Sequence, residues 1–201
     1  MEIYTQDQKE EIIQAFKNHK VLALPTDTVY GVGVLYGEIE DLKRLKQAKH
    51  RPETKAIPMM VANLEQMKKI AKVDKRTKKI VENFLPGPLT LVLPVQDDFN
   101  LEFTNGMKTV ALRIPDEPFV LSIMEELDQA LCVSSANVSG KPAAITQKEA
   151  IENLPNIDGI IQGECKQMQA STIVDCTQES LKILREGPIS LEQLNQLTKG
   201  Q

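Results

Sequence analysis

The stretch Val21-Leu22-Ala23-Leu24-Pro25-Thr26-Asp27-Thr28-Val29-Tyr30-Gly31 decides the fold of this chain. Its apolar start, 21–24, predicts a short buried strand. Pro25 has no N–H to donate, so it ends the strand, and a polar turn with two threonines and one aspartate follows. Because ligands of open α/β sheets bind at the carboxyl ends of strands, we expect this turn to border a binding site. An ordinary loop that follows a strand and binds no ligand would fit the same sequence.

Two glycines, Gly31 and Gly33, follow the turn. Glycine has no Cβ, so it lets the backbone approach a bound molecule closely and adopts positive φ angles without strain. We expect these glycines to serve one of those two purposes. No third glycine stands at the spacing of a dinucleotide-binding fingerprint.

Helical and strand-like patterns alternate along the chain, which predicts an α/β protein. No linker, internal repeat or low-complexity tract divides the 201 residues, so we expect a single domain over 1–201. Capping boxes begin at Thr5, Thr146 and Ser190, while Asn63 and Asp74 open two more helices. The other expected helices span 6–18, 39–48, 119–127 and 146–153. The expected strands span 21–24, 56–61, 89–95, 109–113, 131–133, 157–161, 171–174 and 181–184.

The composition limits the compartment and the partners. A formal charge of −4 argues against non-specific coating of nucleic acid, and the lack of tryptophan makes a base-stacking platform poor. The three cysteines cannot all pair and match no zinc or redox spacing, which favours a reducing compartment. There is no signal-peptide pattern and no apolar stretch of the ~20 residues that a membrane span needs. We expect a soluble cytoplasmic protein.

Motifs of several enzyme classes are missing. The chain has no Gly-x-x-x-x-Gly-Lys-Ser/Thr phosphate loop and no Gly-x-Ser-x-Gly elbow. His19 and His50 are its only histidines, and neither stands in a metal-ligand spacing. A zinc enzyme, a Ser-His-Asp hydrolase and a metal site held by protein side chains are therefore not expected.

Two pairs of polar residues have a spacing that puts them on one side of an extended chain. Pro52 disfavours the α region for Arg51, so we expect 49–52 to be extended and Lys49 and Arg51 to form a cationic pair. Alternation along 109–113 puts Thr109 and Arg113 on one face, where they can converge on one anion. A solvated basic loop and a half-exposed strand fit these spacings equally well.

A second polar turn, 134–140, follows the predicted strand 131–133. Its serines and its asparagine can donate to and accept from a ligand, or serve only as turn formers. The polar residues near strand ends that we select as candidates are Lys49, Arg51, Arg113, Arg185, Thr28, Thr109, Ser135, Asn137 and Ser171. This set holds no evident general base, which indicates a site that binds several anions and acts through positioning and charge neutralisation.

The most basic surface is expected on the helices after Asn63 and Asp74. We interpret it as a solvated face, with the steering of tRNA as the alternative. Its cations are Lys68, Lys69, Lys72, Lys75, Arg76, Lys78 and Lys79.

Several motifs occur in a familiar order from the first helix to Gly187. They are the turn 25–31, Lys49-x-Arg51-Pro52, Leu85-Pro86-Gly87-Pro88-Leu89-Thr90, Thr109-Val110-Ala111-Leu112-Arg113, Ser135-Ala136-Asn137-Val138-Ser139-Gly140, Ser171-Thr172-Ile173-Val174-Asp175 and Leu184-Arg185. Together they resemble the YrdC-like family, the threonylcarbamoyl-AMP synthases. The resemblance implies a twisted, mixed α/β sheet with a large concave positive cavity.

The resemblance also implies an activity. L-threonine, bicarbonate and ATP would condense to threonylcarbamoyl-AMP with release of pyrophosphate, and Mg²⁺ would accompany the ATP phosphates. A partner enzyme would then transfer the threonylcarbamoyl group to the adenosine beside the anticodon of certain tRNAs. Direct contact of this chain with the tRNA is left open.

The resemblance assigns roles to the candidate residues. The residues around threonine would be Thr28, Arg113, Ser135 and Ser171, with Arg113 on the carboxylate. The residues facing ATP would be Lys49, Thr109, Asn137 and Arg185. Lys49 and Arg51 would be catalytic, because their charges offset the repulsion between a carbamate and the α-phosphate.

The chain departs from the family pattern in places. Ala56 and Glu186 stand where prolines are usual, Met60 where some members have a polar residue, and Met168 where a glycine is usual. The second domain of longer members is not expected here. Two alternative functions remain: an RNA-binding module without catalysis, and a paralogue that makes a different acyl or carbamoyl adenylate.

Overall fold

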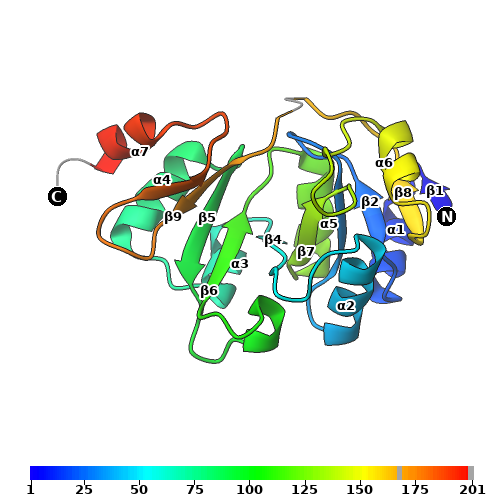
Figure 1. Ribbon diagram of the computed structural model, residues 1–201, viewed down its shortest axis with the longest axis horizontal. Helices are drawn as coiled ribbons and strands as arrows, with labels where there is room; N and C mark the ends of the chain where they lie inside the picture. The colour runs from blue at the N-terminus through cyan, green and yellow to red at the C-terminus, as the bar shows by residue number, and fades with distance from the viewer. Residues whose placement is uncertain (167–168, 199–201) are drawn as a thin grey trace.

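The structure, a computed structural model, describes residues 1–166 and 169–198. Its centre is a mixed sheet of ten strands in the order β1-β8-β2-β3-β7-β4-β6-β5-β9-β10 (Figure 1). The strands are β1 Glu2–Tyr4, β2 Leu22–Leu24, β3 Gly31–Leu35, β4 Met59–Met60, β5 Leu89–Pro94, β6 Thr109–Arg113, β7 Leu131–Ser135, β8 Gly159–Ile161, β9 Thr172–Asp175 and β10 Lys182–Arg185. The predicted α/β class is confirmed.

Helices flank this sheet. They are α1 Lys9–Lys17, α2 Ile39–Ala48, α3 Leu64–Ile70, α4 Lys75–Phe84, α5 Pro118–Leu127, α6 Gln147–Asn153 and α7 Leu191–Thr198, with a 3-10 helix at Leu101–Thr104. The first helix begins at Lys9, three residues later than predicted, and its N-cap residue is Gln8. The capping box predicted at Thr5 is only half formed: the Thr5 N–H donates to Gln8 Oε1 over 3.0 Å, but the Gln8 N–H donates to the Thr5 carbonyl and not to its hydroxyl. Met168 lies outside the described residues.

The largest difference from the predicted strands is at 56–61, where only the two residues of β4 join the sheet. Met59 pairs with Leu112 of β6 on one side and with Cys132 of β7 on the other. Pro58 precedes it and has no N–H for a ladder, which explains the short strand. β4 nevertheless links the two halves of the sheet. Strand β1, which pairs parallel with β8, was not predicted.

Alternation along the strands divides the buried side chains between two cores. Leu22 and Leu24 of β2 pack with α1 and α5 on one face of the sheet. Ala23 between them belongs to the larger core with α2, α3 and α4. Val133 and Cys132 of β7 separate in the same way. The period of two in strand side chains is therefore what holds helices on both faces.

The predicted helix starts are confirmed by their caps. Asn63 Oδ1 accepts from the Gln66 N–H over 3.0 Å, and Asp74 Oδ1 accepts from the Thr77 N–H over 2.7 Å. The capping box at Ser190 is also formed, with hydrogen bonds in both directions between the first and fourth residues. Each cap satisfies backbone donors that the helix itself leaves unpaired.

The segment after α2 is not extended, so this prediction was wrong. The His50 N–H donates to the Gln47 carbonyl over 3.0 Å, and the Arg51 N–H donates to the Lys46 carbonyl over 2.9 Å. These bonds form a Schellman turn, and His50 adopts the left-handed φ of 48° that the turn needs. Lys49 stays helical at φ −89°. The preference that Pro52 imposes applies only to Arg51, so it does not make Lys49 and His50 extended.

Gly31 and Gly33 were expected to adopt positive φ angles or to let the backbone approach a ligand, but their main role is in packing. Neither is among the glycines with positive φ. A Cβ on Gly31 would lie 2.8 Å from Val133 Cγ1, and a Cβ on Gly33 would lie 2.8 Å from both the Cys132 carbonyl oxygen and Val133 Cγ2. The glycines therefore let β3 and β7 pack closely. Only Gly31 also lines the pocket described below.

Gly33→Ala is expected to lower the free energy of unfolding by about 1–3 kcal/mol, because the new methyl group meets backbone that cannot move aside. Gly31→Ala is the matched control. Its methyl group meets only a valine methyl below 3 Å, so its loss should be smaller. Urea denaturation of both variants measures the difference. A loss for Gly31→Ala equal to or larger than that for Gly33→Ala would contradict this explanation.

The cysteines behave as core residues. Cys132, Cys165 and Cys176 are free and buried. Burial raises the pKa of Cys132 and of Cys176 to about 12, so neither thiol ionises near neutral pH. None of the described helices has both the length and the apolar character that a membrane span needs.

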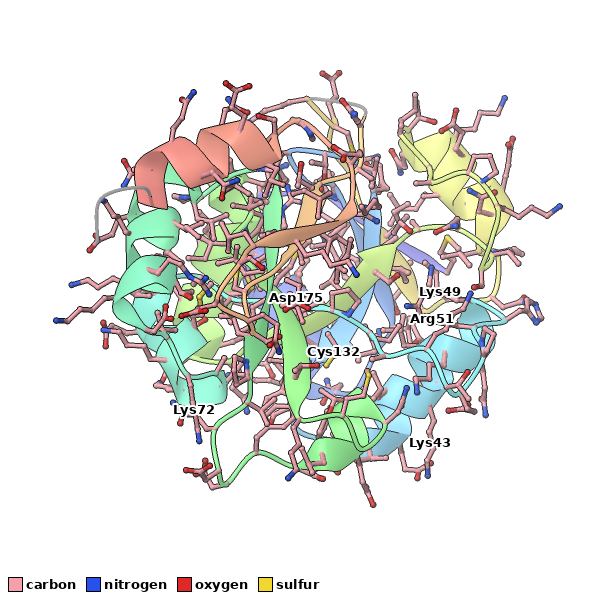
Figure 2. All side chains as sticks on the ribbon, turned by 60° about the vertical axis from the view of Figure 1, so that its left-hand side comes forward. Lys43, Lys49, Arg51, Lys72, Cys132 and Asp175 are labelled. Atoms are coloured by element: carbon pink, nitrogen blue, oxygen red, sulfur yellow. The ribbon has the colours of Figure 1, made fainter. Side chains whose placement is uncertain are left out.

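The basic surface of α3 and α4 is largely matched by acidic neighbours. Its ion pairs are Lys68–Glu65, Lys69–Asp128, Lys72–Asp97 and Lys78–Glu82. Figure 2 shows Lys72 well apart from Lys49 and Arg51. Exposed pairs add little stability, but they offset the positive charge, which favours the solvated-face interpretation.

Candidate functional site

A pocket of about 370 Å³ lies where strand ends from both halves of the sheet meet. The carboxyl ends of β6, β7 and β10 and the amino ends of β3, β5 and β9 border it. The turn after β2 contributes to it as expected, which agrees with the usual place of ligands in α/β sheets. The candidate residues that line the pocket are Thr28, Arg51, Arg113, Ser135, Asn137, Ser171 and Arg185.

The pocket is positive although the chain as a whole carries a formal charge of −4. Its lining includes Arg51, Arg113, Lys141 and Arg185 and, within the described residues, no aspartate or glutamate. Burial lowers the pKa of the three guanidinium groups, but arginine starts from above ~12 and stays charged. This arrangement favours ligands with several negative charges.

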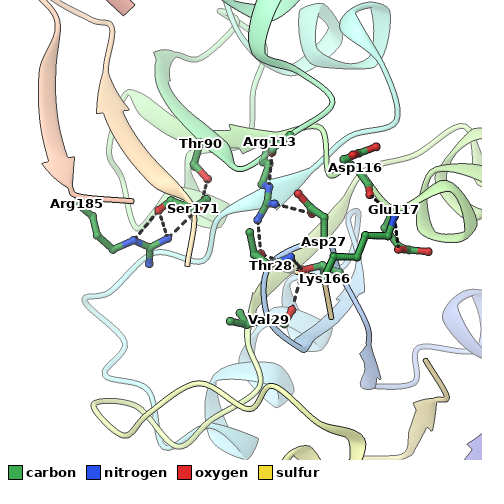
Figure 3. Close-up of polar contacts among 12 residues, drawn as sticks. Asp27, Thr28, Val29, Thr90, Arg113, Asp116, Glu117, Lys166, Ser171 and Arg185 are labelled. Carbon is green, nitrogen blue, oxygen red and sulfur yellow. Dashed lines mark hydrogen bonds and ion pairs between the residues drawn. The ribbon is translucent and has the colours of Figure 1, made fainter. Parts of the chain in front are cut away.

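Arg113 is held at the end of β6 by three acceptors (Figure 3). Its Nε donates to the Gly87 carbonyl over 3.0 Å, its Nη1 to Thr28 Oγ1 over 2.8 Å and its Nη2 to Asp27 Oδ1 over 2.6 Å. A guanidinium has five N–H donors, so two remain for a ligand. They are suited to a carboxylate or a phosphate.

Asp27 contacts a residue of the pocket lining but was not among the candidates. It is 1% exposed, and its ion pair with Arg113 is buried. Its Oδ2 is buried without a partner among the described residues. The only signal in the sequence was its position in the turn 25–28. Its pairing with an arginine 86 residues further along could not be derived from spacing.

Ser171 and Arg185 form a second fixed group (Figure 3). Arg185 Nε and Nη2 donate to the Ser171 carbonyl over 3.0 and 2.9 Å, and Nη2 also donates to Ser171 Oγ over 3.0 Å. Thr90 Oγ1 lies 2.8 Å from Ser171 Oγ. Thr90 lines the pocket because Leu89 and Leu91 on either side of it point into the core. It was not among the candidates, since it is one polar residue in an apolar strand.

Lys49 lies behind the pocket lining and not in it. Its Nζ donates to the Ser135 carbonyl, to the Asn137 carbonyl over 2.7 Å and to Asn137 Oδ1 over 3.4 Å. The side chain is fully buried, with 1% exposure. Burial, and then the charge of Arg51, lowers the pKa of Lys49 to about 7, whereas the oxygen acceptors favour its ammonium form. Lys49 therefore supports the turn that presents Ser135 and Asn137 to the pocket.

The lowered pKa of Lys49 predicts a pH-dependent stability. In the folded protein the pKa of Lys49 is about 7, so its side chain loses its proton above that pH. In the unfolded chain the pKa of a lysine is ~10.4, so the side chain stays protonated up to that pH. The unfolded state therefore binds more protons between these values, and wild-type stability should rise with pH relative to Lys49→Met. Urea denaturation at about pH 6, 8 and 9.5 measures this. A difference that does not change with pH would contradict the lowered pKa.

Arg51 reaches the pocket from the loop after α2. Its Nε donates to the Lys55 carbonyl over 3.2 Å and its Nη2 to the Ala56 carbonyl over 2.6 Å. These contacts close the loop on itself, and the guanidinium also lines the pocket. Figure 2 shows Arg51 beside Lys49, although the two reach this region from a helix end and not from an extended chain.

Thr109 is not among the residues that line the pocket. It begins β6 opposite Pro94, whereas Arg113 ends the same strand. The two residues share a face as predicted, but four steps of ~3.3 Å separate them. They do not converge on one anion, so that expectation was wrong.

No group of three or more histidine, cysteine, aspartate or glutamate side chains in the described part of the chain could hold a metal ion. The pocket lining agrees, since its charged side chains are all cations.

Comparison with known proteins gives the family. The Sua5/YciO/YrdC family, described as "Telomere recombination", matches residues 14–187. The chain belongs to this family. It is 34% identical over 181 residues to the threonylcarbamoyl-AMP synthase of Pyrococcus abyssi and 32% identical over 182 residues to that of Bacillus subtilis. Each match covers 89% of this chain and 53% of the relative, so the chain spans about half the length of these curated relatives.

Solved structures of the Sua5/YciO/YrdC family have the same fold. The crystal structure of P. abyssi Sua5 complexed with L-threonine matches with a TM-score of 0.93 and 30% identity, over 99% of this chain and 61% of that one. Escherichia coli YciO matches with a TM-score of 0.87 over 96% of this chain and all of that one, at 20% identity. The YrdC-like fold implied by the motifs is therefore confirmed.

Proposed function

We propose that this chain is a threonylcarbamoyl-AMP synthase, which condenses L-threonine, bicarbonate and ATP to threonylcarbamoyl-AMP and pyrophosphate. The observation that carries the proposal is one positive pocket, without a carboxylate in its described lining, in which Thr28, Arg113, Ser171 and Arg185 meet. Relatives that are 32–34% identical have this name, and a related structure was solved with L-threonine.

Threonine is the ligand that we assign to the inner group of polar residues. Its carboxylate would receive the two N–H donors of Arg113 that the protein leaves unused. Thr28, Ser135 and Ser171 line the same pocket and offer hydroxyl groups for its amine and side-chain oxygen. Val29 and Met60 also line the pocket and offer apolar contact for its methyl group.

ATP is the ligand that we assign to Asn137, Arg185 and Arg51. In the proposed reaction the neutral threonine amine adds to the carbon of bicarbonate. A C–O bond of bicarbonate breaks, and that hydroxide leaves with one proton of the amine as water, which gives a carbamate. A carbamate oxygen then bonds to the α-phosphorus, the bond from that phosphorus to the β-bridging oxygen breaks, and pyrophosphate leaves with the electron pair. Two unit charges ~4 Å apart repel by ~1–4 kcal/mol, and the cations of Lys49 and Arg51 would offset this.

Mg²⁺ is proposed to accompany the phosphates of ATP. The described residues offer no carboxylate cage, so no protein ligand is assigned to it. Mg²⁺ commonly binds through substrate phosphates and water, which fits a pocket of cations and neutral donors. The further partners proposed are tRNA-modifying enzymes that transfer the threonylcarbamoyl group. The ion-paired face of α3 and α4 gives no support to direct tRNA binding.

Product analysis with labelled bicarbonate tests the proposed activity. Mass spectrometry should detect labelled threonylcarbamoyl-AMP, and pyrophosphate release should need threonine, bicarbonate and Mg-ATP together. Release that is unchanged without threonine would contradict the proposal. A product that forms only with another amino acid or acyl acceptor would indicate the paralogue. Tight tRNA binding without any product would indicate the RNA-binding module.

A further inference from the structure

The cationic side chains of the pocket differ in how many hydrogen bonds they already make to the protein. Arg113 donates to three protein groups and Arg185 to the carbonyl and hydroxyl oxygens of Ser171. Arg51 donates to two carbonyls of its own loop. These three guanidinium groups are therefore fixed before any ligand arrives.

Lys141 is different. It lines the pocket, its residue is exposed, and its ammonium group has no hydrogen bond or ion pair with any described residue. The backbone at this position is held firmly, because the Lys141 N–H donates to the Val138 carbonyl over 3.0 Å and Asn137 Nδ2 donates to the Lys141 carbonyl over 2.6 Å. A fixed backbone with an unoccupied ammonium group at the pocket mouth suits a ligand that enters and leaves.

We propose that Lys141 binds the β- and γ-phosphates of the nucleotide and the pyrophosphate that these phosphates become. This inference rests on the proposed function and adds a binding residue to it. The triphosphate carries most of the negative charge among the substrates, and pyrophosphate must depart after the α-phosphorus bond breaks. A solvated lysine on a flexible stem can follow it, whereas Arg51, Arg113 and Arg185 are held in place by hydrogen bonds to protein acceptors. The threonine end of the pocket already has the fixed cation of Arg113 and needs no further one.

Binding of inorganic pyrophosphate by calorimetry tests this without turnover. Lys141→Ala should weaken pyrophosphate binding about tenfold, as expected for the loss of one hydrogen bond to a charged group, and should raise the KM for ATP similarly. Threonine affinity should stay within about twofold of wild type. Lys141→Arg, which keeps the charge, should recover most of the pyrophosphate affinity.

Lys148→Ala is the matched control, since Lys148 is 86% exposed on α6 and is not among the pocket residues. It removes the same charge and should leave pyrophosphate affinity unchanged. Equal losses in Lys141→Ala and Lys148→Ala, or unchanged affinity in Lys141→Ala, would overturn the proposal. An equal loss of threonine affinity would overturn it as well. If wild type binds pyrophosphate but makes no adenylate, the proposed activity fails while the role of Lys141 in binding is still measured.

Discussion

Arg113→Ala is expected to weaken threonine binding about 100-fold and to lower the free energy of unfolding by about 3–5 kcal/mol. Threonine binding weakens because the variant loses the two N–H donors of Arg113 that we assign to the threonine carboxylate. The free energy of unfolding falls because Asp27, which is 1% exposed, would lose its cationic partner and stay buried. Calorimetry with threonine and with ATP, together with urea denaturation, measures both effects. ATP affinity should fall much less.

Two further variants separate binding from folding. Arg113→Lys keeps a cation beside Asp27 but loses the planar fork, so it should fold well and still bind threonine poorly. The double variant Asp27→Asn with Arg113→Met removes the whole buried pair and should regain most of the stability, but not threonine binding. Equal losses of threonine and ATP affinity in Arg113→Lys would contradict the assignment of this arginine to threonine.

Lys49→Met is expected to lower kcat at least tenfold while the affinity for threonine changes less than about threefold. Its ammonium group supports the turn that carries Ser135 and Asn137, and its charge acts on the reacting anions from behind that turn. Methionine keeps most of the aliphatic volume, so a cavity is not the cause of the loss. Steady-state kinetics with each substrate varied in turn gives the two parameters.

Lys46→Met is a suitable control, because Lys46 of α2 is also a buried lysine, with 3% exposure. Its Nζ donates to the Glu53 carbonyl over 3.0 Å and to Asn105 Oδ1 over 2.8 Å, away from the pocket. It should lower stability without lowering kcat. A kcat for Lys49→Met equal to that of wild type, or a matching loss in Lys46→Met, would argue against a role of the Lys49 charge in turnover.

The elements that could be predicted from the sequence are those set by neighbours a few residues apart. Asn63 and Asp74 cap their helices as predicted, since a cap needs only the N–H groups of the next turn. Strand β6 has the predicted bounds because its apolar and polar residues alternate. The turn after β2 borders the pocket because Pro25 ends that strand. These are local properties of the chain.

Contacts between distant segments decided the rest. Thr109 has the predicted face but lies at the wrong end of its strand, and Lys49 has the predicted charge but lies behind a turn of another element. Spacing could not show that Asp27 pairs with Arg113.

The sequence by itself determined the α/β class, most of the helix caps and, through the order of its motifs, the family. Only the tertiary structure decided which cations are occupied by protein groups and which are open to a ligand. The physical reason is that a helix or strand depends on neighbours in sequence, whereas the burial and hydrogen bonds of a side chain depend on whichever segment packs against it. Lys49 and Lys141 are both lysines near predicted turns. Only folding buries the ammonium group of Lys49 among protein acceptors and leaves that of Lys141 open to a ligand.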